Sequence, residues 1–261
     1  MTGSSAPYVD LRLVARAGGT VGYLTLDNQA KLNTLNRALM TEFIGKVERL
    51  AARDDLRALV LAGAGDKAFI GGASIPEMAA LDHDSAEGFI TLVHRTCDAL
   101  RKLPVPVIAR LDGYALGAGL EVAVSCDLRV ASARAKFGMP EVKVGIPSVI
   151  EAALLPQLIG FGRARELLML GEIIDADTAL RWGLVERVVA HDALDREIET
   201  MVAAILVAGP QAIRQQKALM QAWEGLPIDR AISAGIDAFV RAFETDEPKR
   251  MLSAFAKRKR D

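Results

Sequence analysis

The stretch that decides the fold is residues 112–141, DGYALGAGLEVAVSCDLRVASARAKFGMPE. A predicted apolar strand, residues 105–111, runs into its glycine-rich turn, and a buried helix is predicted over residues 119–126. Glu121 falls one turn inside that helix. The first N–H groups of a helix lack internal partners and carry the positive end of its dipole, so a turn of small residues there can hold a developing negative charge. The pattern indicates a site for acid–base chemistry.

Strands and helices alternate around this block, which predicts an α/β architecture. From about residue 192 the pattern changes to successive amphipathic helices, broken at glycine and proline positions. We therefore expect a core over residues 1–191 and a helical region over residues 192–261. The expected elements are a hairpin (8–15 and 20–26), helices (35–52 and 85–103), strands (57–62 and 128–131) and a glycine-rich loop (63–72).

The composition favours a protein that acts on a small soluble partner. The chain has 261 residues, is 51% hydrophobic and carries a formal net charge of −1, so it can bury a large core and has no basic field for nucleic acid or a membrane surface. The N-terminus lacks the pattern of a signal peptide. Cys97 and Cys126 both fall in apolar helical patterns, which predicts reduced, buried thiols and a cytoplasmic location.

Two turns of small residues are candidates for binding an oxyanion. The first, GGA at residues 71–73, is also explained as a strand-to-helix turn with Ser74 as its N-cap. A second such turn, GAG at residues 117–119, changes the interpretation, because two turns can each supply one backbone N–H to the same oxygen. We predict Ala73 and Ala118 as the donors.

Glu121 and Glu141 are the candidate acid–base groups. A single glutamate is usually a salt-bridged or surface residue, but Glu121 lies among apolar neighbours, where a carboxylate is expensive to bury without a partner or a function. Spacing alone leaves open whether Glu141 returns to the same cleft. Two carboxylates in one cleft titrate as a coupled pair, and such a pair suits the addition of water to a double bond.

Other classes of enzyme find little support. A dinucleotide-binding site would need G-x-G-x-x-G, which does not occur after the predicted strands, and Ser74 does not lie in the G-x-S-x-G of a serine hydrolase. The histidines His83, His94 and His191 are scattered without metal-ligand spacing, so structural or surface roles and no metal site are expected.

Several ordered motifs resemble the enoyl-CoA hydratase/isomerase, or crotonase, superfamily over nearly the whole chain. They are KAFIGGASIPEM (67–78), PVPVIARLDGYALGAGLEVAVSCDLRVAS (104–132), AKFGMPEVKVGIP (135–147), GRARELLMLGEIIDADTALRWGLVERVV (162–189) and TDEPKRMLSAFAKRKR (245–260). The resemblance implies an α/β crotonase-type fold of repeated ββα units with a C-terminal helical trimerisation region. It also implies an enoyl-CoA hydratase that assembles as a homotrimer or a dimer of trimers.

The same resemblance implies roles for individual residues. The oxyanion donors of the family fall on Ala73 and Ala118, and its two hydratase glutamates fall on Glu121 and Glu141. The substrate is then an acyl-CoA thioester, with coenzyme A as part of the substrate and no permanently bound cofactor. A basic run at residues 257–260 is a further candidate for contact with a CoA phosphate. The implied CoA and substrate contacts are Lys31, Leu32, Gly71, Gly72, Ser74, Ile75 and Ser148.

One segment departs from the family. Hydratases commonly continue after Pro-Glu with a glycine-rich GxxPGxGGTxRL, whereas this chain reads GIPSVIEAALLP from Gly145 and adds Glu151 near the expected acyl pocket. The departure leaves the acyl group undetermined. The open alternatives are an isomerase, a CoA-thioester hydrolase or lyase, a CoA-binding protein without activity, and a hydratase for an unusual acryloyl-CoA such as methylthioacryloyl-CoA.

Overall fold

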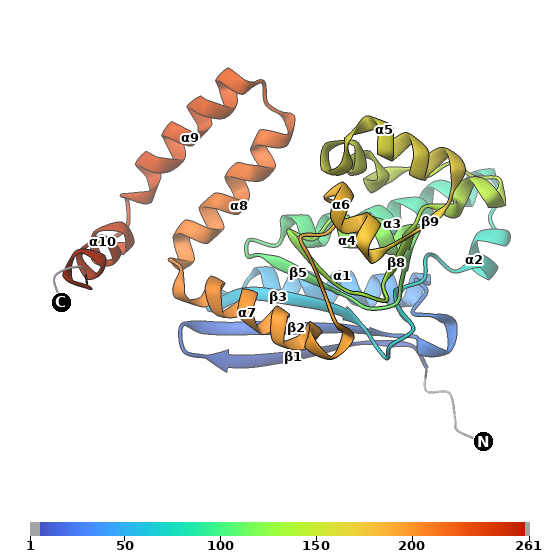
Figure 1. Cartoon of the computed structure of the whole chain (residues 1–261), viewed down its shortest axis with the longest axis horizontal. Coiled ribbons are helices and arrows are strands. Elements are labelled where there is room, and N and C mark those ends of the chain that lie inside the picture. Colours follow the sequence, from blue (N-terminus) through green and yellow to red (C-terminus); the bar gives the residue numbers. More distant parts are fainter. Residues whose placement is uncertain (1–5, 259–261) are drawn as a thin grey trace.

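A computed structural model describes residues 6–258, and its strands form two sheets (Figure 1). The larger sheet has the order β1-β2-β3-β5-β7-β10, in which β1 and β2 are antiparallel and the remaining neighbours are parallel. Its strands are β1 (Tyr8–Arg16), β2 (Gly19–Asp27), β3 (Leu56–Gly63), β5 (Val107–Leu111), β7 (Leu128–Ser132) and β10 (Arg187–Val189). The smaller sheet has the order β4-β6-β8-β9, with strands β4 (Ala68–Ile70), β6 (Tyr114–Leu116), β8 (Lys136–Gly138) and β9 (Ile173–Asp175).

Successive ββα units build both sheets at once. In each middle unit the first strand joins the large sheet and the second joins the small sheet, as in β3-β4, β5-β6 and β7-β8. A helical segment then follows: α2 (Ile75–Ala79) and α3 (His83–Lys102), then α4 (Ala118–Val124), then α5 (Leu155–Leu170). The predicted α/β fold of repeated ββα units is confirmed. Because every unit turns from its second strand into a helix on the same side, the turns before α2 and α4 are brought together.

The central strands of the large sheet, β3, β5 and β7, are buried on both faces, and residue alternation assigns each face. Leu59 and Leu61 of β3 face the main core with α1 (Arg37–Ala51) and α3, whereas Val60 between them faces α7 (Leu194–Val207). This alternation is the two-residue period of a strand. Asn36 caps α1 by accepting from the N–H of Leu39, and Asp82 caps α3 in a capping box with Ser85.

The C-terminal helical region divides into two parts. α7 packs on the sheet, whereas α8 (Pro210–Gly225), α9 (Ile228–Ala242) and α10 (Glu247–Arg258) extend away from the core (Figure 1). Lys217 anchors α8 to the core, because its buried ammonium donates to the carbonyls of Leu100 and Val105 and pairs with Asp127 at 2.7 Å. The remaining helical segments are α6 (Ala176–Trp182) and the 3₁₀ turns η1 (Gln29–Lys31), η2 (Pro140–Val144), η3 (Ile150–Leu154) and η4 (His191–Ala193).

Some local predictions need correction. Residues 63–72 are not one loop, because β4 lies within them and is fully buried. Ser74 occupies the N-cap position of α2 but its side chain makes no capping hydrogen bond, and Pro248 lies inside α10. Cys97 and Cys126 are buried free thiols, as predicted. Within residues 6–258, no helix is both long and apolar enough to cross a membrane.

Candidate active site

A cleft of about 770 Å³ brings the predicted site together. It is lined by the turn before α2, by one face of α3, by the turn before α4 and by the segment from η2 to Val149. Phe89, Ile90 and Val93 give α3 an apolar wall. Glu121 and Glu141 both line the cleft, so the fold does return Glu141 to the neighbourhood of Glu121.

Gly117 makes room for Glu141. Its backbone has φ 52°, in the region that favours glycine, and its N–H donates to the carbonyl of Gly138 at 2.9 Å. A β-carbon built on Gly117 would lie 2.5 Å from Oε1 of Glu141. The glycine therefore satisfies two demands, the turn into α4 and the close approach of a carboxylate.

Glu121 is a buried carboxyl group with few partners. The residue is only 4% exposed, and its Oε1 accepts one hydrogen bond, from the N–H of Ala152 at 3.3 Å. Burial raises the pKa of Glu121 to about 8, and the charges of Glu141 and Glu151 act in the same direction against the hydrogen bond from Ala152. Glu121 therefore holds a proton at neutral pH.

Glu141 sits at the start of η2 and is half-buried. Ser148 donates from Oγ to Oε2 of Glu141 at 2.8 Å, while Oε1 faces Gly117. The two oxygens are thus held in different surroundings, which fixes the orientation of the carboxylate towards the cleft.

The two predicted oxyanion donors also line this cleft. Ala73 lies between Gly72, whose carbonyl accepts from Leu35, and Ser74, whose N–H donates to Leu35. Ala118 is the first residue of α4, where an N–H has no intrahelical partner. Within the described chain, neither N–H donates to a protein acceptor. The turns are close because Gly119 packs against the carbonyl of Ile70, only 1.9 Å from where a β-carbon would lie.

Comparison with known proteins identifies the family. A model of the enoyl-CoA hydratase/isomerase family matches residues 16–261. The chain belongs to the enoyl-CoA hydratase/isomerase family. This family member is 36% identical to crotonyl-CoA hydratase of Syntrophomonas wolfei over 238 residues, which are 91% of this chain and 92% of that protein. It is 34% identical to the short-chain-enoyl-CoA hydratase of Clostridium acetobutylicum, with 93% of both chains covered.

Solved structures of the hydratase/isomerase family agree with the fold. The crystal structure of enoyl-CoA hydratase from Bacillus anthracis superposes with a TM-score of 0.91 at 29% identity and covers 96% of both chains. The predicted crotonase-type fold is confirmed over nearly the full length.

The residues expected to contact CoA in this family member fall into two groups. Gly71, Gly72 and Ile75 line the cleft. Leu32 lies beside it, because its carbonyl accepts from the N–H of Gly71 at 2.8 Å, whereas the exposed side chain of Lys31 does not line it. The roles of these residues stay predictions.

Ser74 and Ser148 do not line the cleft either. Ser148 donates a hydrogen bond to Glu141, which does line the cleft. Its predicted role in substrate binding stays a prediction. Of the basic run at residues 257–260, residues 259 and 260 lie outside the described residues.

Sequence reasoning missed a histidine–carboxylate contact behind Glu121. Nδ1 of His94, on α3, lies 2.7 Å from Oε1 of Glu151, on η3. The two residues are 57 positions apart, and His94 had been expected to play only a structural or surface role. The departure of residues 148–151 from the family's glycine-rich segment was the one signal in the sequence that pointed here.

Proposed function

We propose that this chain is an enoyl-CoA hydratase, a hydro-lyase that adds water across the 2,3 double bond of a 2-enoyl-CoA thioester. The observation that carries the proposal is the placement of two glutamates and two unpaired backbone N–H groups around one cleft. The hydratase names of the similar proteins support the same activity. The substrate itself brings coenzyme A, so no permanently bound cofactor is required.

In the proposed reaction, the thioester oxygen accepts from the N–H groups of Ala73 and Ala118. Both donors are backbone groups held by secondary structure, so they do not have to reorganise when the oxygen becomes an enolate oxygen. The dipole of α4 adds to the stabilisation only modestly, because this helix is short.

Glu121 and Glu141 handle the protons. We propose that they hold one water between them; its oxygen adds at C3, one of its protons passes to the glutamate pair, and the pair delivers a proton to C2. One carboxyl group must therefore be protonated and the other ionised. The raised pKa of Glu121 supports this, because burial disfavours its ionised form and the charge of Glu141 acts in the same direction.

The test is a panel of 2-enoyl-CoA thioesters of different chain length, branching and heteroatom content, including crotonyl-CoA and methylthioacryloyl-CoA, with purified protein. Hydration is followed by loss of the conjugated thioester absorbance and by mass spectrometry of the product. Double-bond migration without water uptake would favour an isomerase, release of free CoA would favour a hydrolase, and no consumption of any thioester would leave a binding protein. Each of these results would refute the hydratase proposal.

We further propose a homotrimer, or a dimer of trimers, in the cytoplasm and with a place in fatty acid metabolism. Apolar side chains on one face of α9 support assembly, because Ile228, Ile232, Ile236 and Phe239 are between 60% and 78% exposed in the single chain. The two free, buried cysteines suit a reducing compartment. Light scattering coupled to gel filtration tests the assembly, and a monomer at micromolar concentration would refute it.

A further inference from the structure

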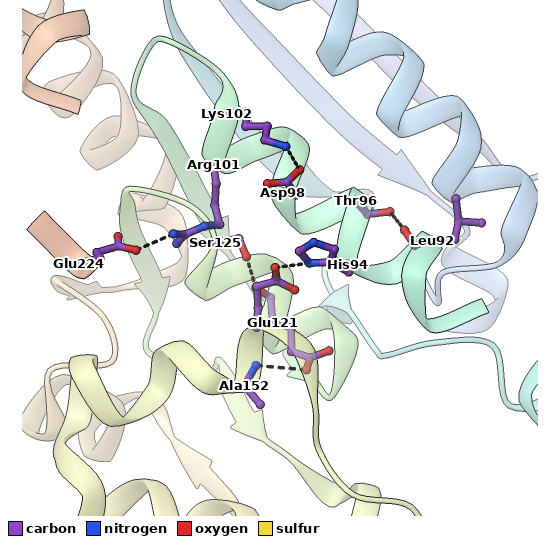
Figure 2. A network of polar contacts seen from close by, with 11 residues as sticks. Leu92, His94, Thr96, Asp98, Arg101, Lys102, Glu121, Ser125, Ala152 and Glu224 are labelled. Carbon is purple, nitrogen blue, oxygen red and sulfur yellow. Dashed lines mark hydrogen bonds and ion pairs between the residues drawn. The ribbon is translucent and has the colours of Figure 1, made fainter. Parts of the chain in front are cut away.

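A third carboxylate lies behind the two that line the cleft. Glu151 belongs to η3 and is only 7% exposed. The next residue, Ala152, donates its N–H to Oε1 of Glu121 at 3.3 Å (Figure 2). The short helix that supports Glu121 therefore also brings a second buried carboxylate beside it.

The two oxygens of Glu151 have different surroundings. Oε1 lies 2.7 Å from Nδ1 of His94. Oε2 is buried and has no hydrogen-bond partner among the described residues, a condition that only one other buried side-chain atom in that range shares. An unpartnered buried carboxylate oxygen destabilises a fold, so its presence here calls for a function.

The charges near this carboxylate are mostly negative or neutral. On α3 it faces His94 and the thiol of Cys97; on α4 it faces Glu121, with Glu141 of η2 beyond. Burial raises the pKa of the Cys97 thiol well above its ordinary value, so this group is neutral. His94 is then the one cationic candidate among these groups, and its side chain is 48% exposed to solvent.

We propose that Glu151 is a positioning residue for Glu121: η3 fixes Glu121 through the N–H of Ala152, and the carboxylate of Glu151 opposes a second negative charge on Glu121. His94 contacts one oxygen of Glu151 from the surface, at 2.7 Å. A side chain at position 94 that keeps a positive charge would compensate Glu151, and a neutral one leaves the charge of Glu151 to act on Glu121 in full. The catalytic consequence rests on the proposed hydratase function, but the effect on the ionisation of Glu121 does not.

The test measures that ionisation without turnover. Glutamate carboxyl carbons labelled with ¹³C are titrated by NMR, and the signal missing in Glu121→Gln identifies Glu121. Glu151→Gln should lower the midpoint of Glu121, by a shift smaller than that caused by Glu141→Gln, because Glu151 is the weaker of the two neighbouring charges of like sign. His94→Lys should also lower it, because a lysine stays positive in the pH range where Glu121 titrates and compensates Glu151. His94→Gln should leave it in place, since this change alters the packing at position 94 without adding a charge.

His191→Lys is a matched control. His191 also contacts a buried carboxylate, that of Asp112 at 3.0 Å, and its side chain has the same 48% exposure, but Asp112 is not a residue of the cleft. Its replacement should leave the midpoint of Glu121 unchanged. If Glu151→Gln does not fold, His94→Lys decides alone: a lowered midpoint supports the proposal, and an unchanged or raised midpoint overturns it.

A kinetic measurement adds the catalytic consequence. The pH profile of kcat/KM should shift in the same directions as the NMR midpoints, and Glu151→Asp should restore part of the wild-type profile. Midpoints that shift while no thioester is hydrated would leave the positioning role intact and refute the hydratase function. Hydration by all variants with unmoved midpoints and profiles would refute the positioning role alone.

Discussion

Two histidines of this protein contact buried carboxylates, and the two sites differ in how completely those carboxylates are satisfied. Both histidine side chains are 48% exposed, and both carboxylate residues are almost fully buried, Glu151 at 7% and Asp112 at 4%. Asp112 accepts from Ser132 at 2.7 Å and from two nitrogens of Arg134 at 2.8 and 2.9 Å. Among the residues that the structure describes, Glu151 has His94 as its one side-chain partner and leaves its other oxygen without a hydrogen bond.

The difference separates a carboxylate with several donors from the carboxyl groups at the proposed acid–base site. Burial pulls the pKa of Asp112 upward, but the hydrogen bonds and charge of Arg134, the bond from Ser132 and the charge of His191 outweigh it and leave the pKa below its ordinary value. Glu121 is also buried, but it accepts only one hydrogen bond, so burial raises its pKa to about 8. The number of donors thus decides whether a buried carboxyl group is held ionised or can carry a proton at neutral pH.

The largest effect is expected from replacing Glu121 or Glu141, the two proposed acid–base groups. Glu121→Gln and Glu141→Gln should each lower the hydration rate by about two to four orders of magnitude, because a positioned acid–base group contributes that much. The unfolding temperature of Glu121→Gln should stay the same or rise, since the change removes a buried carboxyl group without a charged partner. Steady-state kinetics on the best thioester and thermal unfolding provide the two measurements.

Asp112→Asn is the control for that experiment because it changes an equally buried carboxylate away from the cleft. It should keep the hydration rate per folded molecule. If either active-site variant kept wild-type turnover, the two-glutamate mechanism would be wrong.

The second prediction concerns stability against pH. The pKa of Glu121 is about 8 in the folded chain against an ordinary value of 4.5. Between these values the folded state keeps a proton that the unfolded chain has released, so the free energy of unfolding falls as the pH rises. One pKa unit corresponds to about 1.4 kcal/mol, so the loss across the window is on the order of 5 kcal/mol. Urea unfolding of the wild type and of Glu121→Gln at pH 5 to 8.5 measures it, and the variant should show a flatter dependence.

Asp112 makes the free energy of unfolding depend on pH in the opposite direction. Its pKa is lowered, so it contributes stability above its ordinary value of 3.8 and loses that contribution as the pH falls through its folded pKa. Asp112→Asn should therefore flatten the acid side of the stability curve. An unchanged alkaline side in Glu121→Gln would show that Glu121 is not the group that titrates there.

Much of the lining of the candidate active site could be predicted because its parts are local in sequence. The two glycine-rich turns and both glutamates stand in short motifs, and each ββα unit repeats the same turn into a helix. The strands β4, β6 and β8 are three residues long, too short for an alternating pattern to show, so residues 63–72 were predicted as a loop. The contact of His94 with Glu151 joins α3 to η3, and no local pattern encodes such a pairing.

The third prediction concerns the stability of the site around Asp112. Asp112→Asn removes the charge that Arg134 and His191 face, and it weakens the hydrogen bonds within a nearly inaccessible site. We expect a loss of about 1–3 kcal/mol in the free energy of unfolding, the range for leaving a buried polar group unsatisfied. Denaturant titration at pH 7 measures this loss. Unchanged stability together with a slower reaction would contradict the structural role assigned to this site.

The smallest effects separate the two sites by one hydroxyl group each. Ser148 donates to Glu141 at 2.8 Å, and Ser132 donates to Asp112 at 2.7 Å, so the two serine-to-alanine changes are chemically matched. Ser148→Ala should slow hydration roughly tenfold with little change in stability, because it frees one oxygen of a half-buried carboxylate that lines the cleft. Ser132→Ala should lower the free energy of unfolding by about 1 kcal/mol and leave the rate unchanged, because Ser132 is fully buried beside a carboxylate that takes no part in the chemistry. Steady-state kinetics and denaturant unfolding are measured on both variants. If Ser132→Ala slowed hydration and Ser148→Ala lowered the free energy of unfolding instead, the number of donors would not distinguish the two sites.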